Sequence, residues 1–198
     1  MTGDNPQTPA RRPLRALVIA DKEPGLGMPL TDFVHMHAID VVITAGDLER
    51  YMLRGIDTLT IPTMGVYGNH CDRKYLDVLA IENLHLTTVT VAGVTFTGLE
   101  GSVRYKPDPQ PAMYTQDEYR DLVAALPAAD VLVTHCPPRG INDHGSHAHV
   151  GIDALLGWLD RVRPTLMIHG HTHPRNGVVQ HHGQTAVEWV YGARIIEI

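Results

Sequence analysis

The sequence predicts one layered α/β domain built on mixed sheets, and two patterns support this prediction. In the first half of the 198 residues, short apolar runs alternate with amphipathic stretches of helical periodicity, as they do in βαβ units. In the middle and at the C-terminus, apolar and polar residues alternate around glycine-containing turns, which is typical of hairpins. Parallel units and hairpins in one chain favour sheets that contain both strand directions.

The first half is predicted to contain three strands and two helices. Residues 14–20, 40–46 and 61–68 are apolar runs of strand length. Residues 29–38 have apolar side chains at helical spacing after a proline, and residues 72–80 form a second, shorter helical pattern. Strands and helices therefore alternate in this half.

The second half is predicted to begin with a hairpin. Residues 84–98 show the alternation of β-strands and are broken by an Ala-Gly pair, where we expect the turn. Thr115 and Glu118 then have the spacing of a capping box, so a helix is expected to begin there and to end before Pro127.

The remaining residues complete the predicted domain. We expect a strand at residues 131–134, a helix at 151–162 and a strand at 164–170. Residues 176–198 alternate apolar and polar between glycines, which predicts an antiparallel meander. Residues 1–13 lack such patterning and are predicted to be a disordered tail, which leaves residues 14–198 as a single domain.

Composition narrows the classes of partner and compartment. The formal net charge of −6 offers no basic surface, which disfavours long nucleic acids. No apolar run approaches the roughly 20 residues that cross a bilayer, so no membrane partner is expected. The two cysteines lack the spacing of a disulfide framework, so a reducing, cytoplasmic location is the default expectation.

Histidine is the unusual residue of this composition. The chain has 13 histidines, and nine of them fall between His135 and His182. Imidazole concentrated in one third of a chain favours metal chemistry. A set of solvated, histidine-rich loops would give the same composition and is the alternative.

Five predicted strands end on side chains that can bind metals. In open α/β sheets, binding sites form beyond the carboxyl ends of the strands. The donors at these ends are Asp21 and Glu23, Asp47, Asn69 and His70, His135, and His171 and His173. They are too many for one four-coordinate zinc ion, but they suit two divalent ions about 3.5–4 Å apart that share a carboxylate. Mn²⁺, Fe²⁺ and Zn²⁺ all accept such ligands.

This series of motifs resembles that of the calcineurin-like metallophosphoesterase superfamily. The motifs are Asp21-Lys22-Glu23, Gly46-Asp47, Gly68-Asn69-His70, Thr134-His135 and Gly170-His171-Thr172-His173. The stretch THCPPRGIND, followed by HVG, is similar to the small phosphodiesterase branch of the superfamily. The resemblance implies an α/β fold of four layers, an α/β/β/α sandwich with two mixed β-sheets.

The resemblance also implies a role for each donor. It implies a first metal held by Asp21 and His173, a second held by Asn69, His135 and His171, and a bridging Asp47. It further implies a phosphoester hydrolase in which hydroxide bridging the two metals attacks phosphorus. His70 would protonate or stabilise the leaving oxygen, and Asn69 and His70 would contact the substrate. A hydrogen-bonded turn histidine is the structural alternative for His70.

Glu23 is the first departure from the family pattern, which usually has histidine at this position. Glu23 could ligate a metal, leave the position to water or face solvent. As a ligand it would add a third carboxylate to Asp21 and Asp47, which favours Mn²⁺ over zinc and diesters over dianionic monoesters. We therefore expect a manganese-dependent phosphodiesterase, with Fe or Zn as alternatives. The sequence does not name the substrate: a cyclic nucleotide or another small phosphodiester is a candidate, and so are nucleic-acid ends and phosphoproteins.

Cys71 is the second departure, because the family commonly has Asp or Glu directly after the histidine. Asp72 stands one position late, so the group that orients His70 need not be the usual carboxylate. Cys71 and Cys136 each follow a site histidine. They are either small buried side chains or a redox-sensitive pair near the metals, and the sequence leaves both possibilities open.

Residues 139–149 form a polar loop in which Arg139 is a candidate phosphate contact and His144, His147 or His149 could add an imidazole. A solvated loop is the plainer alternative.

A metallo-β-lactamase is disfavoured because no Asp-His pair follows the His-Thr-His motif. A non-catalytic scaffold of the same fold, used for protein interaction, is the remaining alternative to an enzyme.

Overall fold

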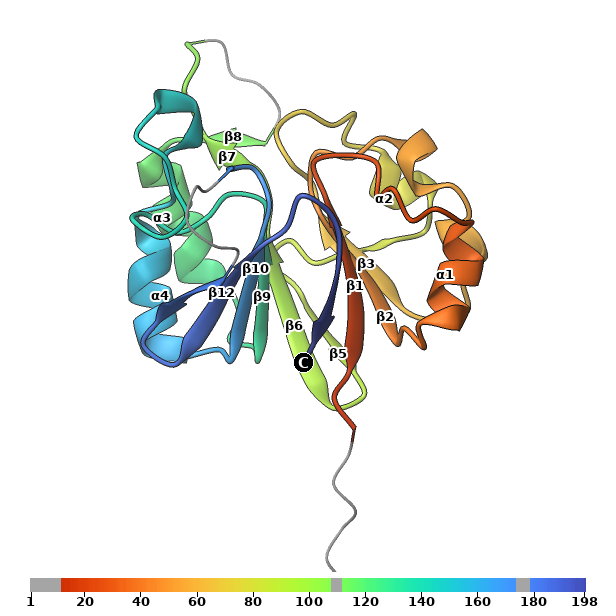
Figure 1. The fold of residues 1–198 in the computed structure, drawn as a ribbon. Coiled ribbons are helices and arrows are strands. Elements are labelled where there is room, and N and C mark those ends of the chain that lie inside the picture. The colour runs from red at the N-terminus through yellow and green to blue at the C-terminus, as the bar shows by residue number, and fades with distance from the viewer. Residues whose placement is uncertain (1–11, 108–111, 174–178) are drawn as a thin grey trace, which may run out of the picture.

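Two β-sheets pack face to face, and helices cover their outer sides (Figure 1). The computed structural model describes residues 12–107, 112–173 and 179–198. Its four layers confirm the predicted α/β/β/α sandwich with two mixed sheets. The predicted N-terminal tail lies almost wholly outside the described residues, whereas Arg12 at its end forms an ion pair with Asp40 (2.6 Å).

The first sheet has the strand order β13-β1-β2-β3-β4. Its strands are β13 (Gly192–Glu197), β1 (Arg15–Ala20), β2 (Val41–Ala45), β3 (Thr63–Val66) and β4 (Glu82–Asn83). The four strands β1 to β4 are parallel, and β13 is antiparallel to β1 at the edge. The carboxyl ends of β1, β2 and β3 therefore point to the same rim.

The second sheet has the order β11-β12-β10-β9-β6-β5. Its strands are β11 (Val179–His182), β12 (Thr185–Trp189), β10 (Leu166–His169), β9 (Val131–Thr134), β6 (Val94–Leu99) and β5 (Thr88–Val91). The inner strands β12, β10, β9 and β6 are parallel, and hairpins add antiparallel strands at both edges. The hairpin predicted around the Ala-Gly pair is confirmed as β5 and β6.

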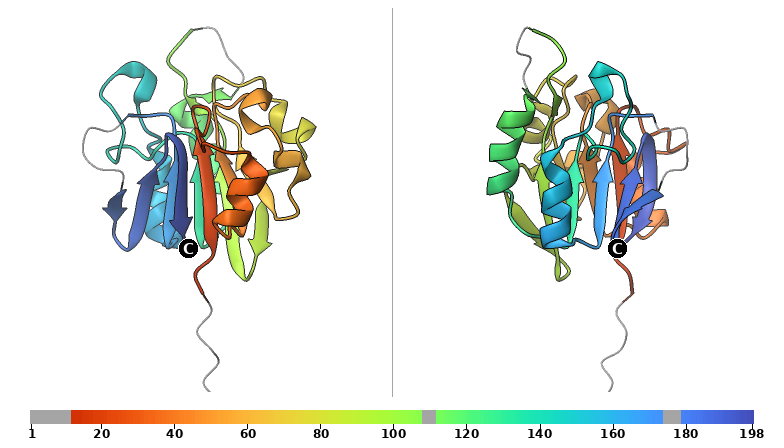
Figure 2. Two further views of the ribbon diagram at one scale, coloured as in Figure 1. Left: turned by 45° about the vertical axis from the view of Figure 1, so that its right-hand side comes forward. Right: turned by 90° about the vertical axis from the view of Figure 1, so that its left-hand side faces the viewer.

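The helices form the two outer layers (Figure 2). The first sheet is covered by α1 (Leu30–Met36), α2 (Tyr75–Val78) and the 3-10 helices η1 (Arg50–Leu53) and η2 (Ile56–Thr58). The second sheet is covered by α3 (Gln116–Ala125) and α4 (Ala154–Val162). The remaining short elements are β7 (Ser102–Val103), β8 (Met113–Tyr114) and η3 (His147–His149). The capping box of Thr115 and Glu118 begins α3 as predicted.

Alternation along the strands builds three apolar cores between the four layers. In β1, Val18 packs between the two sheets, while Leu17 packs beneath α1. In β9, Val131 packs between the sheets, while Leu132 packs beneath α3 and α4. These side chains are fully buried, and burial of each large one stabilises the fold by about 1.5–3 kcal/mol.

The predicted C-terminal meander is wrong. β11 and β12 do form an antiparallel hairpin, but β12 then pairs with β10 in parallel, and β13 leaves for the first sheet. The chain changes sheets after β12 at Gly192, whose φ of +83° is a backbone conformation that favours glycine. Alternation of apolar residues is the same for either sheet, so the pattern alone does not reveal this crossing.

The helix predicted at residues 72–80 is also shorter than expected, because α2 has only four residues. In the part of the chain that the structure describes, no helix has the length and apolar character of a membrane span.

Candidate metal centre

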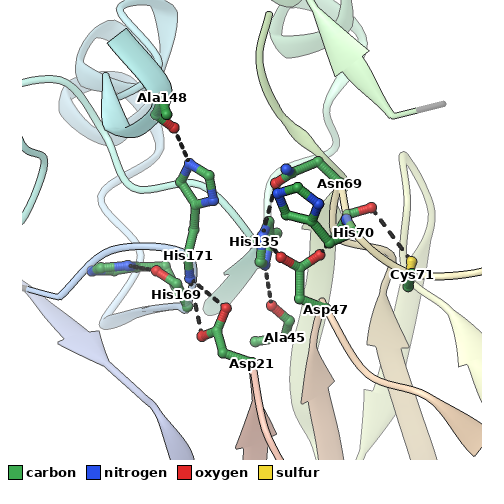
Figure 3. A network of polar contacts seen from close by, with 12 residues as sticks. Asp21, Ala45, Asp47, Asn69, His70, Cys71, His135, Ala148, His169 and His171 are labelled. Atoms are coloured by element: carbon green, nitrogen blue, oxygen red, sulfur yellow. Dashed lines mark hydrogen bonds and ion pairs between the residues drawn. The ribbon is translucent and has the colours of Figure 1, made fainter. Parts of the chain in front are cut away.

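The donor side chains meet at one rim of the sandwich and come from both sheets (Figure 3). Asp21, Asp47 and Asn69 follow β1, β2 and β3 of the first sheet, and His135 and His171 follow β9 and β10 of the second. Ligand atoms of Asp47, His135 and His171 lie within 4.8 Å of one another. The strand ends therefore converge as the sequence predicts.

Three of the donors occupy an unfavourable backbone conformation. Asp21, Asp47 and His171 have φ values of 65°, 54° and 65°, in the left-handed region. For a residue other than glycine, this left-handed backbone conformation costs about 1–2 kcal/mol of conformational energy. Such strain persists where surrounding structure over-determines it, and it gathers at functional sites. Each of these residues turns sharply out of its strand at the rim.

Two glycines of the motifs are required by close packing around these donors. A Cβ atom on Gly46 would lie 2.5 Å from Nδ1 of His135. A Cβ atom on Gly68 would overlap the carboxylate of Asp47. Glycine before Asp47 and before Asn69 therefore lets the strands approach closely enough to bring the donors together.

His135 is fully buried, and the acceptors around it define the orientation of its ring. Its Nδ1 lies 2.9 Å from the carbonyl oxygen of Ala45, which can only accept, so Nδ1 carries a hydrogen. Its Nε2 faces two further oxygens, Oδ2 of Asp47 at 3.2 Å and Oδ1 of Asn69 at 3.1 Å. A neutral ring would aim its lone pair at these oxygens, so either a proton or a metal cation belongs between them.

The charges respond to this arrangement. Although burial lowers the pKa of His135, the charges and hydrogen bonds of its neighbours, Asp47 foremost, raise it to about 9. Burial acts to raise the pKa of Asp47, but the charge of His135 and hydrogen bonds lower it to about 2. Without a metal, the raised pKa keeps His135 protonated, so its positive charge lies beside the oxygens of Asp47 and Asn69. A bound metal ion would replace this proton. The residues fit a divalent cation.

His171 and Asp21 extend the cluster. His171 donates from Nε2 to the carbonyl oxygen of Ala148 (2.9 Å), which leaves Nδ1 unprotonated and free to ligate. Burial and then the charge of His135 lower the pKa of His171 to about 3, so the ring is neutral. Both carboxylate oxygens of Asp21 accept the backbone N–H of His171 (3.1 Å), and burial raises the pKa of Asp21 to about 6.

The ligands proposed for one ion lie close together, whereas those proposed for the other ion are less tightly grouped. His173 is exposed, packs its ring edge-on against Tyr191 (4.6 Å between centroids) and lines the same cavity as Asp21 and Asp47. Glu23 is exposed and is absent from the cavity lining. The structure therefore brings the donors of the second ion together and leaves Glu23 outside the cluster, so its role as a ligand stays a prediction.

A cavity of about 470 Å³ opens beside these donors. Besides Asp21, Asp47, His70, His171 and His173, it is lined by Glu49, Met52, Tyr105, Ala148, His149 and Tyr191. Of these six, the sequence indicated only His149. The others lie on loops or in single-turn 3-10 helices, which leave no periodic pattern. The position of Glu49, two residues after Asp47, is the one signal that could have been used.

The loop of residues 139–149 reaches the cavity through residues other than Arg139. Arg139 is exposed, pairs with Asp143 (3.7 Å) and does not line the cavity. The loop contributes instead Ala148 and His149, whose ring lies 5.3 Å from that of His171. Of the predicted substrate contacts, the structure places His70 on the cavity wall and Asn69 beside His135, but not Arg139.

The two cysteines are unpaired, and their sulfur atoms face backbone carbonyls. Cys71 Sγ donates to the carbonyl of Gly68 (3.4 Å), and Cys136 Sγ donates to that of Val150 (3.4 Å). Burial raises the pKa of both thiols, that of Cys136 to about 12. Neither thiol has the low pKa of a reactive cysteine.

A four-layer sandwich whose strand ends gather carboxylates, an amide and imidazoles around a cavity defines the class of metal-dependent phosphoesterases. The chain belongs to the calcineurin-like phosphoesterase family, whose pattern it matches over residues 28–175. That range contains every motif except the one at Asp21. The superfamily inferred from the motifs is therefore confirmed.

Several known proteins are similar to this chain. A UPF0046 protein of Caenorhabditis elegans is 31% identical over 105 residues, which are 50% of this chain and 34% of that protein, so the match spans about a third of the relative. The TT1561 protein of Thermus thermophilus has a TM-score of 0.61 at 16% identity, covering 89% of this chain and 88% of that one.

Two further solved structures share the fold. Phosphopantetheinyl hydrolase (PptH) from Mycobacterium tuberculosis has a TM-score of 0.60 at 13% identity, covering 93% of this chain and 96% of that one. A structure described as a novel archaeal phosphodiesterase has a TM-score of 0.52 at 12% identity, covering 93% and 100%. Identities this low show a common fold and leave the substrate open.

Proposed function

We propose that this protein is a phosphodiesterase that works with two divalent metal ions, manganese preferred. One ion would be held by Asp47, Asn69, His135 and His171, and the other by Asp21, Asp47 and His173. Ions bound there would supply positive charge for the phosphoryl oxygens and lower the pKa of an attacking water. The observation that carries the proposal is that Nε2 of His135 faces Oδ2 of Asp47 (3.2 Å) and Oδ1 of Asn69 (3.1 Å), an arrangement that suits a cation bound by all three.

The side chains of the centre would hold and orient the substrate. His70 stands on the cavity wall, and its backbone N–H donates to Oδ1 of Asp47 (2.7 Å). This bond fixes the base of the His70 side chain beside the proposed bridging carboxylate, from where its ring would give a proton to the leaving oxygen. Asn69 is held at the same point through Oδ1, and its buried Nδ2 has no partner among the described residues, so it could donate to a phosphoryl oxygen.

The charges of the cavity favour a diester. Among the described residues, the lining includes three carboxylates, those of Asp21, Asp47 and Glu49, and neither arginine nor lysine. With two divalent ions bound, these carboxylates would offset most of the metal charge, so the wall would favour the dianion of a phosphomonoester over the monoanion of a phosphodiester less than a more positive site would. The cavity volume is within the range of small-molecule sites, so the substrate would be a cyclic nucleotide or another small phosphodiester. One structural relative is itself described as a phosphodiesterase.

The donor set also supports the choice of metal and of compartment. Oxygen atoms of Asp21, Asp47 and Asn69 stand beside three imidazoles, a mixture that suits Mn²⁺ and also admits Fe²⁺ or Zn²⁺. Both cysteines are free thiols, which supports a reducing compartment such as the cytoplasm.

Turnover of paired chromogenic esters tests the proposal. With manganese-loaded protein, kcat/KM on bis(p-nitrophenyl) phosphate should exceed that on p-nitrophenyl phosphate. Glu49→Gln removes one negative charge from the cavity wall, and it should narrow this ratio by about two- to fivefold. Glu82→Gln, at an exposed position away from the cavity, should leave the ratio unchanged. A strong preference for the monoester in the wild-type protein would contradict the proposal.

A further inference from the structure

We propose that Tyr105 is the residue that positions the His70 imidazole, in place of a carboxylate. This inference rests on the proposed function, because it concerns the group that would protonate the leaving oxygen. Nε2 of His70 lies 3.3 Å from the hydroxyl of Tyr105, and both side chains line the same cavity. With the backbone bond from His70 to Asp47, the contact holds both ends of the residue.

The residues that follow His70 are engaged elsewhere. Asp72 accepts the backbone N–H groups of Lys74 (2.8 Å) and Tyr75 (3.1 Å), and so holds the turn that leads into α2. Its other oxygen pairs with Arg50 (3.5 Å). Cys71 directs its thiol to the carbonyl of Gly68. Asp72 and Cys71 therefore serve the turn that carries His70.

Tyr105 is held in place by its neighbours along the chain. The backbone N–H of Arg104 donates to the carbonyl of Tyr114 (2.8 Å), next to the pairing of β7 with β8. The side chain of Arg104 bonds to Glu118 (3.0 Å) and to the carbonyl of Met113 (3.1 Å). The residue before Tyr105 is thus anchored to β8 and to the start of α3.

A buried carboxylate joins the segments of the two partners. Glu100 is 2% exposed and accepts from Arg73 (2.8 Å) and from the hydroxyl of Tyr114 (2.6 Å). Arg73 lies on the loop that carries His70, and Tyr114 lies on β8, which anchors the segment of Tyr105. Glu100 therefore fixes the distance between the loop of His70 and the segment of Tyr105.

A phenol suits this position better than a carboxylate would. A hydroxyl can both donate and accept, so it can bond to Nε2 of His70 whether or not this nitrogen carries a hydrogen. It also adds no negative charge to a wall that already has three carboxylates. The expected result is a fixed imidazole without further repulsion of the phosphate.

Kinetics of Tyr105→Phe test the positioning role, because phenylalanine keeps the ring and removes only the hydroxyl. Loss of one hydrogen bond should lower kcat on bis(p-nitrophenyl) phosphate by about three- to tenfold, with KM changed less. In a His70→Ala background the same substitution should change kcat by less than twofold, because its partner is gone. Tyr51→Phe, at an exposed tyrosine outside the cavity, is the matched control.

Nuclear magnetic resonance of the metal-free protein gives an independent readout. The side-chain ¹⁵N signals of His70, assigned with His70→Gln, should move in Tyr105→Phe and stay in place in Tyr51→Phe. Unchanged signals, or an equal loss of kcat in both backgrounds, would overturn the role of Tyr105. If the protein turned over neither ester, the proposed function would fail, while the spectra would still decide whether the contact exists.

Discussion

His135 is the residue whose contacts define the centre. Its Nδ1 is committed to the carbonyl of Ala45, and its Nε2 faces oxygens of Asp47 and Asn69. A ring held in this way requires a positive charge between its Nε2 and the two oxygens. Without a metal, a proton on Nε2 would supply this charge, and in the loaded protein we expect a metal ion to supply it.

Metal affinity is therefore predicted to rise with pH. Burial lowers the pKa of His135, but the neighbouring carboxylates raise it to about 9, so the ring stays protonated at neutral pH. A metal ion must displace this proton, and its apparent affinity should rise about tenfold per pH unit from pH 7 to 9 and then level off. Calorimetric titration with Mn²⁺ in buffers of different ionisation enthalpy measures both the affinity and the released proton.

His182→Asn provides a control for this titration, because His182 bonds to Asp160 on the surface and is outside the cavity lining. The variant should show the same slope as the wild-type protein. An affinity independent of pH between 7 and 9 would refute the account of His135.

At the scale of elements, local sequence signals correctly predict those structures that form between residues close together in the chain. The β5–β6 hairpin and the start of α3 follow from an Ala-Gly turn and from the capping box of Thr115 and Glu118. The destination of β13 does not follow, because its alternation fits either sheet and only tertiary packing selects the first. Glu49 and Tyr105 were missed for a similar reason, since irregular segments carry them to the cavity.

Asp130, which precedes β9, forms hydrogen bonds to the two neighbouring strands of the second sheet, at the end opposite the metal centre. Its Oδ2 accepts the backbone N–H (2.9 Å) and the hydroxyl (2.6 Å) of Thr95, beside the start of β6. Its backbone carbonyl accepts the N–H of Thr165, which precedes β10. The hydrogen bonds from Thr95 lower the pKa of Asp130.

Asp130→Asn is predicted to cost about 1 kcal/mol of unfolding free energy at pH 7, because bonds to a carboxylate are stronger than bonds to an amide. A lowered folded-state pKa contributes stability above the pKa of the unfolded chain, about 3.9, and this contribution is lost as pH falls through the folded value. Urea unfolding with chelator at pH 7 and pH 3 measures the difference between variant and wild type. An equal difference at both values would be contrary to this account, and Asp121→Asn, on the exposed side of α3, is the control.

At the scale of the whole molecule, the metal centre depends on the packing of the two sheets. Asp21, Asp47 and Asn69 come from the first sheet, and His135 and His171 come from the second. The sequence predicted this convergence because parallel strands direct their carboxyl ends to one rim. It could not place Glu23 and Arg139, because both lie on irregular segments after the strands, and the structure leaves both outside the cavity lining.

Metal stoichiometry is the most direct test of the central claim. The protein would be loaded with excess Mn²⁺, desalted and measured by elemental analysis, alongside Asp47→Asn and the control Asp121→Asn. Because Asp47 stands where both ions would share a ligand, the account predicts about two manganese ions per chain in the wild type and the control, and at most one in Asp47→Asn. A wild-type protein that retained one ion would contradict the paired centre, and one that retained none would favour a non-catalytic scaffold of this fold.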